Sequence, residues 1–146
     1  MKLSEAVLLG LGEIRFTNDH WLGISSSSKY ECEGCLAGAA IFAMGLRQPL
    51  NIDTKLEEFW PWVRKYRIEA IPCPVTGCGN IPASSYFGFA NVLTHVACHF
   101  KVGRFSAEQI ADWLHSIEQE EDANTSSGRE QSVLAQCEEI AASNNT

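Results

Sequence analysis

The sequence predicts a mainly α-helical protein: one small helical domain held together by a zinc-finger-like Cys2His2 site, followed by an acidic linker and a C-terminal amphipathic helix. Its 146 residues, 45% of them hydrophobic, are enough for one core and too few for two. Apolar residues recur at helical spacing, and two cysteines and two histidines have the spacing of metal ligands. We expect the helical domain at residues 1–117, the linker at 118–129 and the C-terminal helix at 130–146.

Three helices are predicted in the first half of the chain. Ser4 can cap a first helix that runs to about Phe16. Residues 17–34 contain Asn, Asp, Gly and a run of serines, which predicts a loop. A second helix at 35–46 is so rich in Ala and Gly that neighbours can approach it closely, and we therefore expect it in the middle of the core. The capping-box spacing of residues 54–57 predicts the start of a third helix, which continues past a proline.

The second half begins with a predicted short strand at residues 67–71. A long aromatic helix follows at about 86–101, where apolar side chains recur at helical spacing. Ser106 and Gln109 have the spacing of a capping box and predict the start of the next helix. After the acidic linker, an apolar stripe over residues 133–141 predicts the final amphipathic helix.

The net charge of −7 is concentrated at the C-terminal end of the chain. Residues 118–146 hold seven acidic residues and one basic residue, whereas the remaining part holds 11 acidic and 10 basic residues. Nucleic-acid binding gains its affinity by neutralising phosphates with basic side chains. A basic footprint of that kind is missing from this composition.

No apolar run in the sequence approaches the roughly 20 residues that a helix needs to span a bilayer. The N-terminal segment 1–6 places Glu5 where a signal peptide would begin its apolar core. We therefore expect a soluble, cytoplasmic protein without a membrane partner.

Cys73, Cys78, His95 and His99 are the predicted metal ligands. In the segment Cys-Pro-Val-Thr-Gly-Cys, the proline and the glycine can shape a knuckle that exposes backbone N–H groups near the sulfurs. His95 and His99 are four residues apart on a predicted helix, so both rings leave the same face. Zinc prefers four nitrogen or sulfur ligands in a tetrahedron, often supplied as two close pairs by a turn and a helix. The pattern therefore predicts a structural zinc site.

Other interpretations of these residues remain open at this point. The four residues can also be small buried cysteines and hydrogen-bonded histidines of an ordinary core. Cys98 lies three residues after His95 and can replace one histidine as a ligand. Cys137, on the apolar stripe of the last predicted helix, is predicted to be structural. His20 and His115 are isolated in the sequence, and no role is assigned to them.

The pair Cys32 and Cys35 allows two further interpretations. It can join the knuckle cysteines in a four-cysteine site, or it can be a redox pair, because a helix N-terminus at Cys35 would lower the pKa of that thiol. A thioredoxin-like site needs a strand just before its first cysteine, whereas a Ser/Gly-containing loop is predicted here. We therefore expect Cys35 in the core and Cys32 at the edge of the loop.

Four segments together resemble a group of small, uncharacterised phage and bacterial proteins. They are the opening Met-Lys-Leu-Ser-Glu-Ala, the Cys-Leu-Ala-Gly-Ala-Ala at 35–40, the Cys-Pro-x-x-x-Cys knuckle, and a His-bearing helix followed by Phe-Ser-Ala-Glu-Gln-Ile-Ala-Asp-Trp at 105–113. The resemblance implies that Cys73, Cys78 and the two histidines of that helix form the metal set, and it implies a phage or mobile-element setting. This chain departs from the group in its longer knuckle spacer and in the extension over residues 118–146.

We expect a non-enzymatic zinc-binding protein, because four good ligands leave no open position on the metal. It would act by protein–protein interaction, through surface aromatics for which Trp21, Trp60 and Trp62 are candidates and through its acidic tail. In a phage it would be an inhibitor or modulator of a host machine, such as a defence nuclease or a transcription complex, and would work in the host cytoplasm. The alternative is a nucleic-acid-binding transcriptional regulator that uses the zinc-finger-like helix pair.

Overall fold

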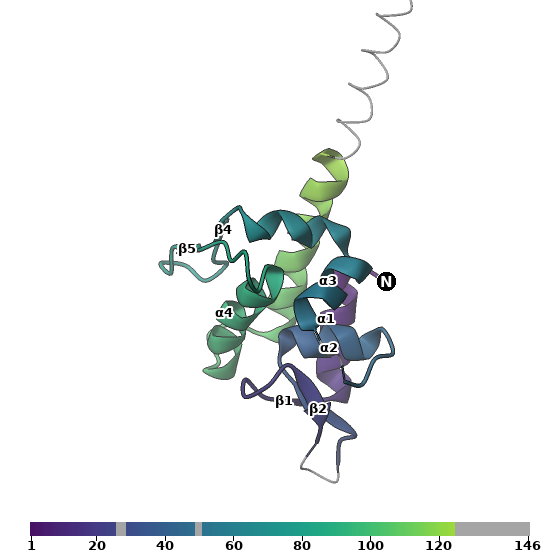
Figure 1. Cartoon of the computed structure of the whole chain (residues 1–146). Coiled ribbons are helices and arrows are strands. Elements are labelled where there is room, and N and C mark those ends of the chain that lie inside the picture. Colours follow the sequence, from purple (N-terminus) through teal and green to yellow (C-terminus); the bar gives the residue numbers. More distant parts are fainter. Residues whose placement is uncertain (26–28, 49–50, 125–146) are drawn as a thin grey trace, which may run out of the picture. The chain divides into compact units, whose positions relative to one another are not determined.

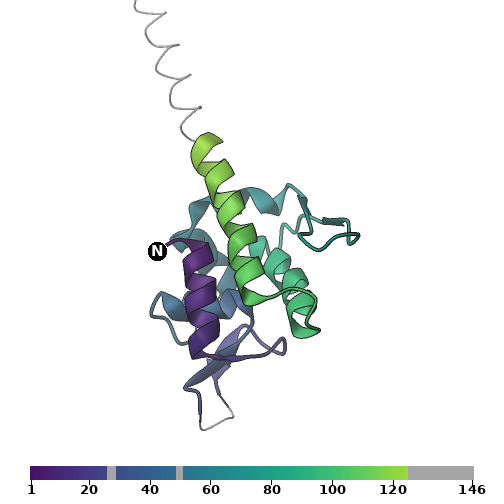
Figure 2. The same cartoon turned by 180° about the vertical axis from the view of Figure 1, so that it is seen from behind.

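The computed structural model describes residues 1–25, 29–48 and 51–124, and these are mainly helical, as predicted. The chain divides into two compact units, Met1–His115 and Ser116–Thr146. The first unit contains all the named helices and strands and is drawn in Figures 1 and 2.

The first helix, α1 (Leu3–Glu13), begins two residues earlier than a cap at Ser4 would allow. Its N-cap is Lys2, whose backbone N–H donates to the Glu5 carboxylate at 3.1 Å, while Ser4 lies inside the helix and is buried. The predicted cap at Ser4 is therefore wrong, because a glutamate in the first turn can reach back to whichever residue precedes the helix. The helix also ends before Phe16, which belongs to a strand.

Helix α2 (Leu36–Ala43) lies in the middle of the core, as its Ala- and Gly-rich sequence predicts. All of its residues from Leu36 to Phe42 are buried. A Cβ atom added at Gly38 would lie only 1.7 Å from the carbonyl oxygen of Trp21. On α1, a Cβ added at Gly10 would lie 1.9 Å from the carbonyl oxygen of Ala39. The small residues thus permit backbone-to-backbone approach on two sides of α2.

A three-stranded sheet takes two of its strands from the segment predicted to be a loop, and its first strand lies at the end of the predicted first helix. Its strands are β1 (Arg15–Phe16), β2 (Leu22–Ile24) and β3 (Cys32–Gly34), in the order β1-β3-β2. Strand β3 runs parallel to β1 and antiparallel to β2. Strands of two or three residues are too short to display an alternating pattern, and glycine has a low strand propensity, so the sheet has no clear signal in the sequence.

The predicted third helix is divided into two elements. Helix α3 (Ile52–Phe59) is capped by Asn51, whose side-chain oxygen accepts the backbone N–H of Thr54 at 3.4 Å, so the predicted cap at Thr54 is wrong. A 3-10 helix, η1 (Pro61–Arg67), follows directly. Proline has no backbone N–H to donate and disfavours the helical conformation of the residue before it, which explains the break.

A buried carboxylate connects α3 to η1. Glu57 is 8% exposed and accepts hydrogen bonds from both Nε and Nη2 of Arg67. The guanidinium of Arg64 lies 3.7 Å from the same carboxylate. Two cations of η1 therefore compensate the one buried charge of α3 and connect the two elements.

The following hairpin consists of β4 (Ile71–Pro72) and β5 (Asn80–Ile81), which pair antiparallel. The predicted strand at 67–71 is thus wrong except at its last residue, because the backbone before it is helical or irregular. Helix α4 (Phe89–Lys101) starts three residues later than predicted, after Gly88 with a φ of +53°. Figures 1 and 2 both show the hairpin beside α4.

The last described helix spans residues 107–124. Its predicted capping box is confirmed: Gln109 N–H donates to Ser106 Oγ at 3.1 Å, and Ser106 N–H donates to Gln109 Oε1 at 2.9 Å. The helix continues into the segment expected to be a linker, so residues 118–124 are helical. The rest of that linker and the predicted helix at 130–146, including Cys137, lie outside the described residues.

The core of the first unit combines aliphatic side chains of the helices with an aromatic cluster. Phe89 is 1% exposed, and its ring lies 5.4 Å from that of Trp62, 5.2 Å from that of Tyr66 and 6.5 Å from that of Trp113. The N-terminal end of α4 is therefore anchored against η1. Within the described part of the chain, no helix is both long enough and apolar enough to cross a membrane.

Candidate metal centre

The β4–β5 hairpin supplies two thiols. Cys73 directly follows β4, and its N–H donates to the carbonyl oxygen of Gly79 at 2.8 Å, which extends the strand pairing by one step. Inside this loop, Cys78 N–H donates to the carbonyl oxygen of Val75 at 3.2 Å. Gly77 and Gly79 have φ values of +83° and +92°, which residues other than glycine rarely adopt. The two glycines flanking Cys78 thus allow the chain to turn back within six residues of Cys73.

Helix α4 supplies two imidazoles. The rings of His95 and His99, four residues apart, have centroids 5.2 Å apart and planes at 65°. The opposite face of the helix carries Leu93, Val96 and Ala97, all fully buried. The direction in which the two histidines point is therefore set by burial of the other face, independently of any ligand.

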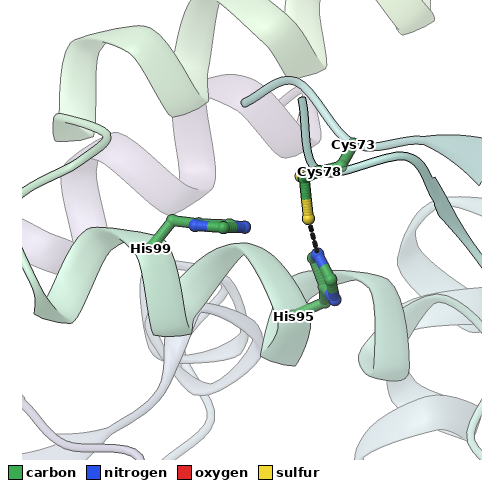
Figure 3. Close-up of side chains that lie close together, drawn as sticks. All are labelled: Cys73, Cys78, His95 and His99. Carbon is green, nitrogen blue, oxygen red and sulfur yellow. Dashed lines mark hydrogen bonds between the residues drawn. The ribbon is translucent and has the colours of Figure 1, made fainter. Parts of the chain in front are cut away.

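The hairpin and the helix bring the four predicted residues together, as Figure 3 shows. Their ligand atoms all lie within 4.8 Å of one another, and Cys78 Sγ lies 3.2 Å from His95 Nε2. A tetrahedral zinc site would hold its two sulfurs about 3.8 Å apart, since each Zn–S bond is about 2.3 Å. The two nitrogens would lie about 3.3 Å apart, since each Zn–N bond is about 2.0 Å, so a contraction of up to about 1.5 Å would bring the group to that geometry. The four residues can hold a metal ion.

The surroundings of the site influence its protonation. Partial burial raises the pKa of the Cys73 thiol, and the neighbouring Cys78 thiol raises it further, while a hydrogen bond from the backbone of Val75 lowers it. Partial burial also lowers the pKa of His95, and the positive charge that His99 can carry lowers it further. The His95 ring is therefore neutral at neutral pH, and a metal must displace the proton of Cys73 and replace the contact between His95 Nε2 and Cys78 Sγ in order to bind.

The alternative ligands are not part of this cluster. Among the residues that the structure describes, Cys73, Cys78 and the two histidines are the one group of three or more potential metal ligands that lie close together. Cys98 is exposed on α4 and lies outside the cluster. Cys32 and Cys35 are buried in β3 and at the start of α2, so they do not complete a four-cysteine site with the hairpin.

The environment of Cys35 does not favour a redox pair either. The thiol is 4% exposed and donates to the carbonyl oxygen of Trp21 at 3.6 Å. Burial raises the pKa of Cys35, although hydrogen bonds from the first turn of α2 oppose that effect, whereas a reactive thiol needs a lowered pKa. The expected core position of Cys35 is confirmed. The expected loop-edge position of Cys32 is wrong, because it is 3% exposed within β3.

An ionic cluster that the sequence did not reveal lies on the three-stranded sheet, whose strand β3 contains Cys32. Glu33 of β3 is 7% exposed, and its carboxylate lies 2.5 Å from Arg15 Nη1 and 3.5 Å from His20 Nε2. His20, which is isolated in the sequence, thus contacts a buried acid. The cluster depends on β1 pairing with β3, and that pairing could not be predicted.

The predicted surface aromatics are only partly correct. Trp60 is 4% exposed and its indole N–H donates to the carbonyl oxygen of Met1 at 3.0 Å, so it is a core residue. Trp21 and Trp62 are half-buried. The most exposed aromatic side chains described are instead Tyr86 and Phe87, at 78% and 42%. They lie in the turn before α4, which was expected to be helical.

Comparisons of the chain with protein-family models, with curated proteins and with solved structures find no match. The fold and the site therefore define the class of protein by themselves: a small helical protein in which a hairpin and a helix form a Cys2His2 cluster that can hold a metal ion. The resemblance to small phage and bacterial proteins stays a prediction from the sequence.

Proposed function

We propose that Cys73, Cys78, His95 and His99 bind one Zn²⁺ as a structural site. The observation that carries this proposal is the convergence of two thiols and two imidazoles within 4.8 Å. A tetrahedral set of two sulfur and two nitrogen ligands is the set that zinc prefers. Harder cations such as Mg²⁺ and Ca²⁺ prefer oxygen ligands, which this set does not contain.

The physical role of the ion would be to connect the hairpin to α4. Strands β4 and β5 have two residues each, and a two-stranded hairpin is marginally stable on its own in water. A zinc ion bound to both cysteines and both histidines would join the hairpin to a helix whose other face is anchored in the core. Metal binding would then contribute directly to the free energy of folding.

The same ligand set supports a protein without enzymatic activity. A catalytic zinc site has three protein ligands and keeps one position open for water or substrate. Four protein ligands complete the tetrahedron, so the ion has no vacant position at which to activate water. The proposed zinc is therefore structural, and the function would be exerted through binding.

We further propose that the protein acts by binding another protein. The exposed rings of Tyr86 and Phe87 and the net charge of −7 are features that a protein partner can recognise. In the phage setting that the sequence resemblance implies, the protein would inhibit or modulate a host machine such as a defence nuclease or a transcription complex. A nucleic-acid regulator has less support, because Arg64 and Arg67, two of the three cations of η1, are engaged with Glu57.

Metal content of the purified full chain, measured by elemental analysis, tests the zinc proposal. We expect one zinc per chain in the wild type and in the Cys98→Ser and His115→Ala variants. Cys98 is a matched control because it is an exposed cysteine on the same helix as the histidines. Cys78→Ser and His99→Ala should each lose the zinc. A wild-type protein purified without metal that also fails to bind added zinc would overturn the proposal.

A further inference from the structure

A second site, separate from the metal centre, lies at the start of α3. A cavity of about 340 Å³ is formed by three segments far apart in the sequence, and its lining residues are Trp21, Asn51, Ile52, Asp53, Tyr86 and Phe87. Three of the six are aromatic and one is a carboxylate. None of these described lining residues is a lysine, an arginine or a histidine.

The aromatic rings form a continuous wall. The ring of Phe87 lies 6.3 Å from that of Trp21, with the planes at 46°, and 4.8 Å from that of Tyr86, with the planes at 82°. The three rings therefore pack in sequence along the lining of the cavity, with Phe87 in contact with both of the others. The faces of aromatic rings carry the negative part of the ring quadrupole and attract cations.

The carboxylate of Asp53 adds a full negative charge. Asp53 is half-buried in the first turn of α3. In the described part of the chain its carboxylate makes no direct hydrogen bond or ion pair, although it attracts the more distant Arg67, whereas Glu57 one turn later binds two arginines directly. A half-buried carboxylate beside three aromatic rings favours a positively charged occupant.

Contacts within the protein hold the wall in place without a ligand. The carbonyl oxygen of Trp21 accepts the N–H of Cys35 at 3.2 Å, and Gly38 leaves room for that oxygen against α2. On the other side, the N–H of Phe87 donates to Ser84 Oγ at 3.0 Å. A preformed site loses less conformational entropy when it binds a ligand.

We propose that this cavity binds a quaternary ammonium group, with Trp21, Tyr86 and Phe87 around the methyl groups and Asp53 balancing the charge. A quaternary ammonium ion has an apolar surface and a delocalised positive charge, and aromatic cages are the usual way in which proteins recognise it. None of the lining residues belongs to the metal cluster, so the inference goes beyond the zinc proposal and does not depend on it.

The group has two sources, a trimethylated lysine in a protein and a small molecule such as choline. Binding is tested by NMR titration of the full chain, purified in zinc-containing buffer, with tetramethylammonium, choline and a capped peptide that contains trimethyl-lysine. The indole N–H signal of Trp21, assigned with a Trp21→Phe variant, reports on the cavity. We expect a Kd on the order of a millimolar for choline, as for a ligand with few heavy atoms. Tighter binding of the peptide than of choline identifies the protein source, and the reverse identifies the small molecule.

A neutral analogue separates charge recognition from apolar contact. The carbon isostere of choline, in which a tert-butyl group replaces the trimethylammonium group, has the same shape and no charge. It should bind about tenfold more weakly, since both the ring quadrupoles and the carboxylate favour a cation. Equal affinity for choline and its isostere would overturn the proposal, as would an unchanged Trp21 signal at saturating concentrations of all three cations.

Two variants test the roles of the lining residues. Asp53→Asn is nearly isosteric, and Tyr86→Ala removes a side chain that is 78% exposed, so neither change should unfold the protein. Each should weaken choline binding by about fivefold or more. Glu58→Gln, on the same helix but outside the lining, should leave the affinity unchanged. Unchanged affinity in both Asp53→Asn and Tyr86→Ala would refute the site. Zinc content is measured on the same samples, so a failure of the metal proposal is recognised separately.

Discussion

The two cysteine pairs of this protein have similar spacings in the sequence but opposite environments in the structure. Cys32 and Cys35 are 3% and 4% exposed, in a central strand and at the start of the central helix. Cys73 and Cys78 lie in a hairpin at least partly accessible to solvent, and they face two histidines. The shorter spacer of the first pair would make it the more familiar metal-binding pattern. The difference teaches that access and convergence with other ligands, rather than spacing alone, distinguish a metal site from a core.

The largest expected effect is the loss of folding stability when zinc is removed from the hairpin cysteines. At a free zinc concentration about a thousandfold above Kd, a bound ion stabilises the folded state by about 4 kcal/mol. We expect a chelator, or the change Cys73→Ser, to lower the free energy of unfolding by about that amount, measured by urea denaturation with zinc in the buffer. Cys98→Ser serves as the control and should retain the wild-type value. Equal stability of the wild type with zinc and with chelator would show that the hairpin does not depend on a metal.

A change of pH sharpens the comparison, because only the hairpin thiols should exchange protons for metal. Burial raises the pKa of Cys73, so its thiol is protonated at neutral pH in the metal-free protein, and zinc must displace that proton. Burial lowers the pKa of His95. Its ring therefore stays neutral as the pH falls toward the ordinary pKa of histidine, and protons do not compete with zinc for this ligand there. Zinc affinity should accordingly decrease as the pH falls, by a factor that approaches about a hundredfold per pH unit when two thiol protons are displaced.

This slope is measured by competition for zinc with a chelating dye at several pH values between about 6.5 and 8. These values lie below the ordinary pKa of a thiol. An affinity that is independent of pH would mean that the thiols do not bind the ion as thiolates. The stability of the metal-free protein is the control, and it should change far less over the same range.

The smallest effect is expected for the buried pair. Cys35→Ala removes one sulfur atom and its hydrogen bond to the Trp21 carbonyl, and typical changes of this kind cost about 1 kcal/mol. Zinc content should remain that of the wild type. Loss of zinc in a folded Cys35→Ala variant, detected by elemental analysis alongside circular dichroism, would erase the distinction between the two pairs.

Several parts of the fold could be predicted because their causes are local. The Ser106 and Gln109 capping box consists of two residues three apart and needs no other part of the chain. The central position of α2 follows from side chains too small to hold neighbours away. The proximity within each metal-site pair followed from an i, i+4 histidine pair on a helix and a short cysteine loop, in each of which the backbone brings the side chains together.

Other parts could not be predicted because their causes lie far away in the chain. The cap of α3 is Asn51 rather than Thr54, a choice between two capable residues that the packing of the helix decides. Glu33 is buried because β3 pairs with both β1 and β2, and strands of two or three residues have no periodicity to reveal this. Trp60 is buried, and its indole N–H donates to the carbonyl oxygen of Met1, 59 residues away.

The sequence by itself determined that this protein is mainly helical, which cysteines and histidines can hold a metal, and where the last described helix begins, since each depends on spacing within one element or between neighbouring ones. Only the tertiary structure decided which cysteine pair is accessible and that Trp21, Asp53, Tyr86 and Phe87 line one cavity. The physical reason is that burial and convergence depend on which surfaces meet when the chain folds. Those contacts join residues whose separation in the sequence carries no signal.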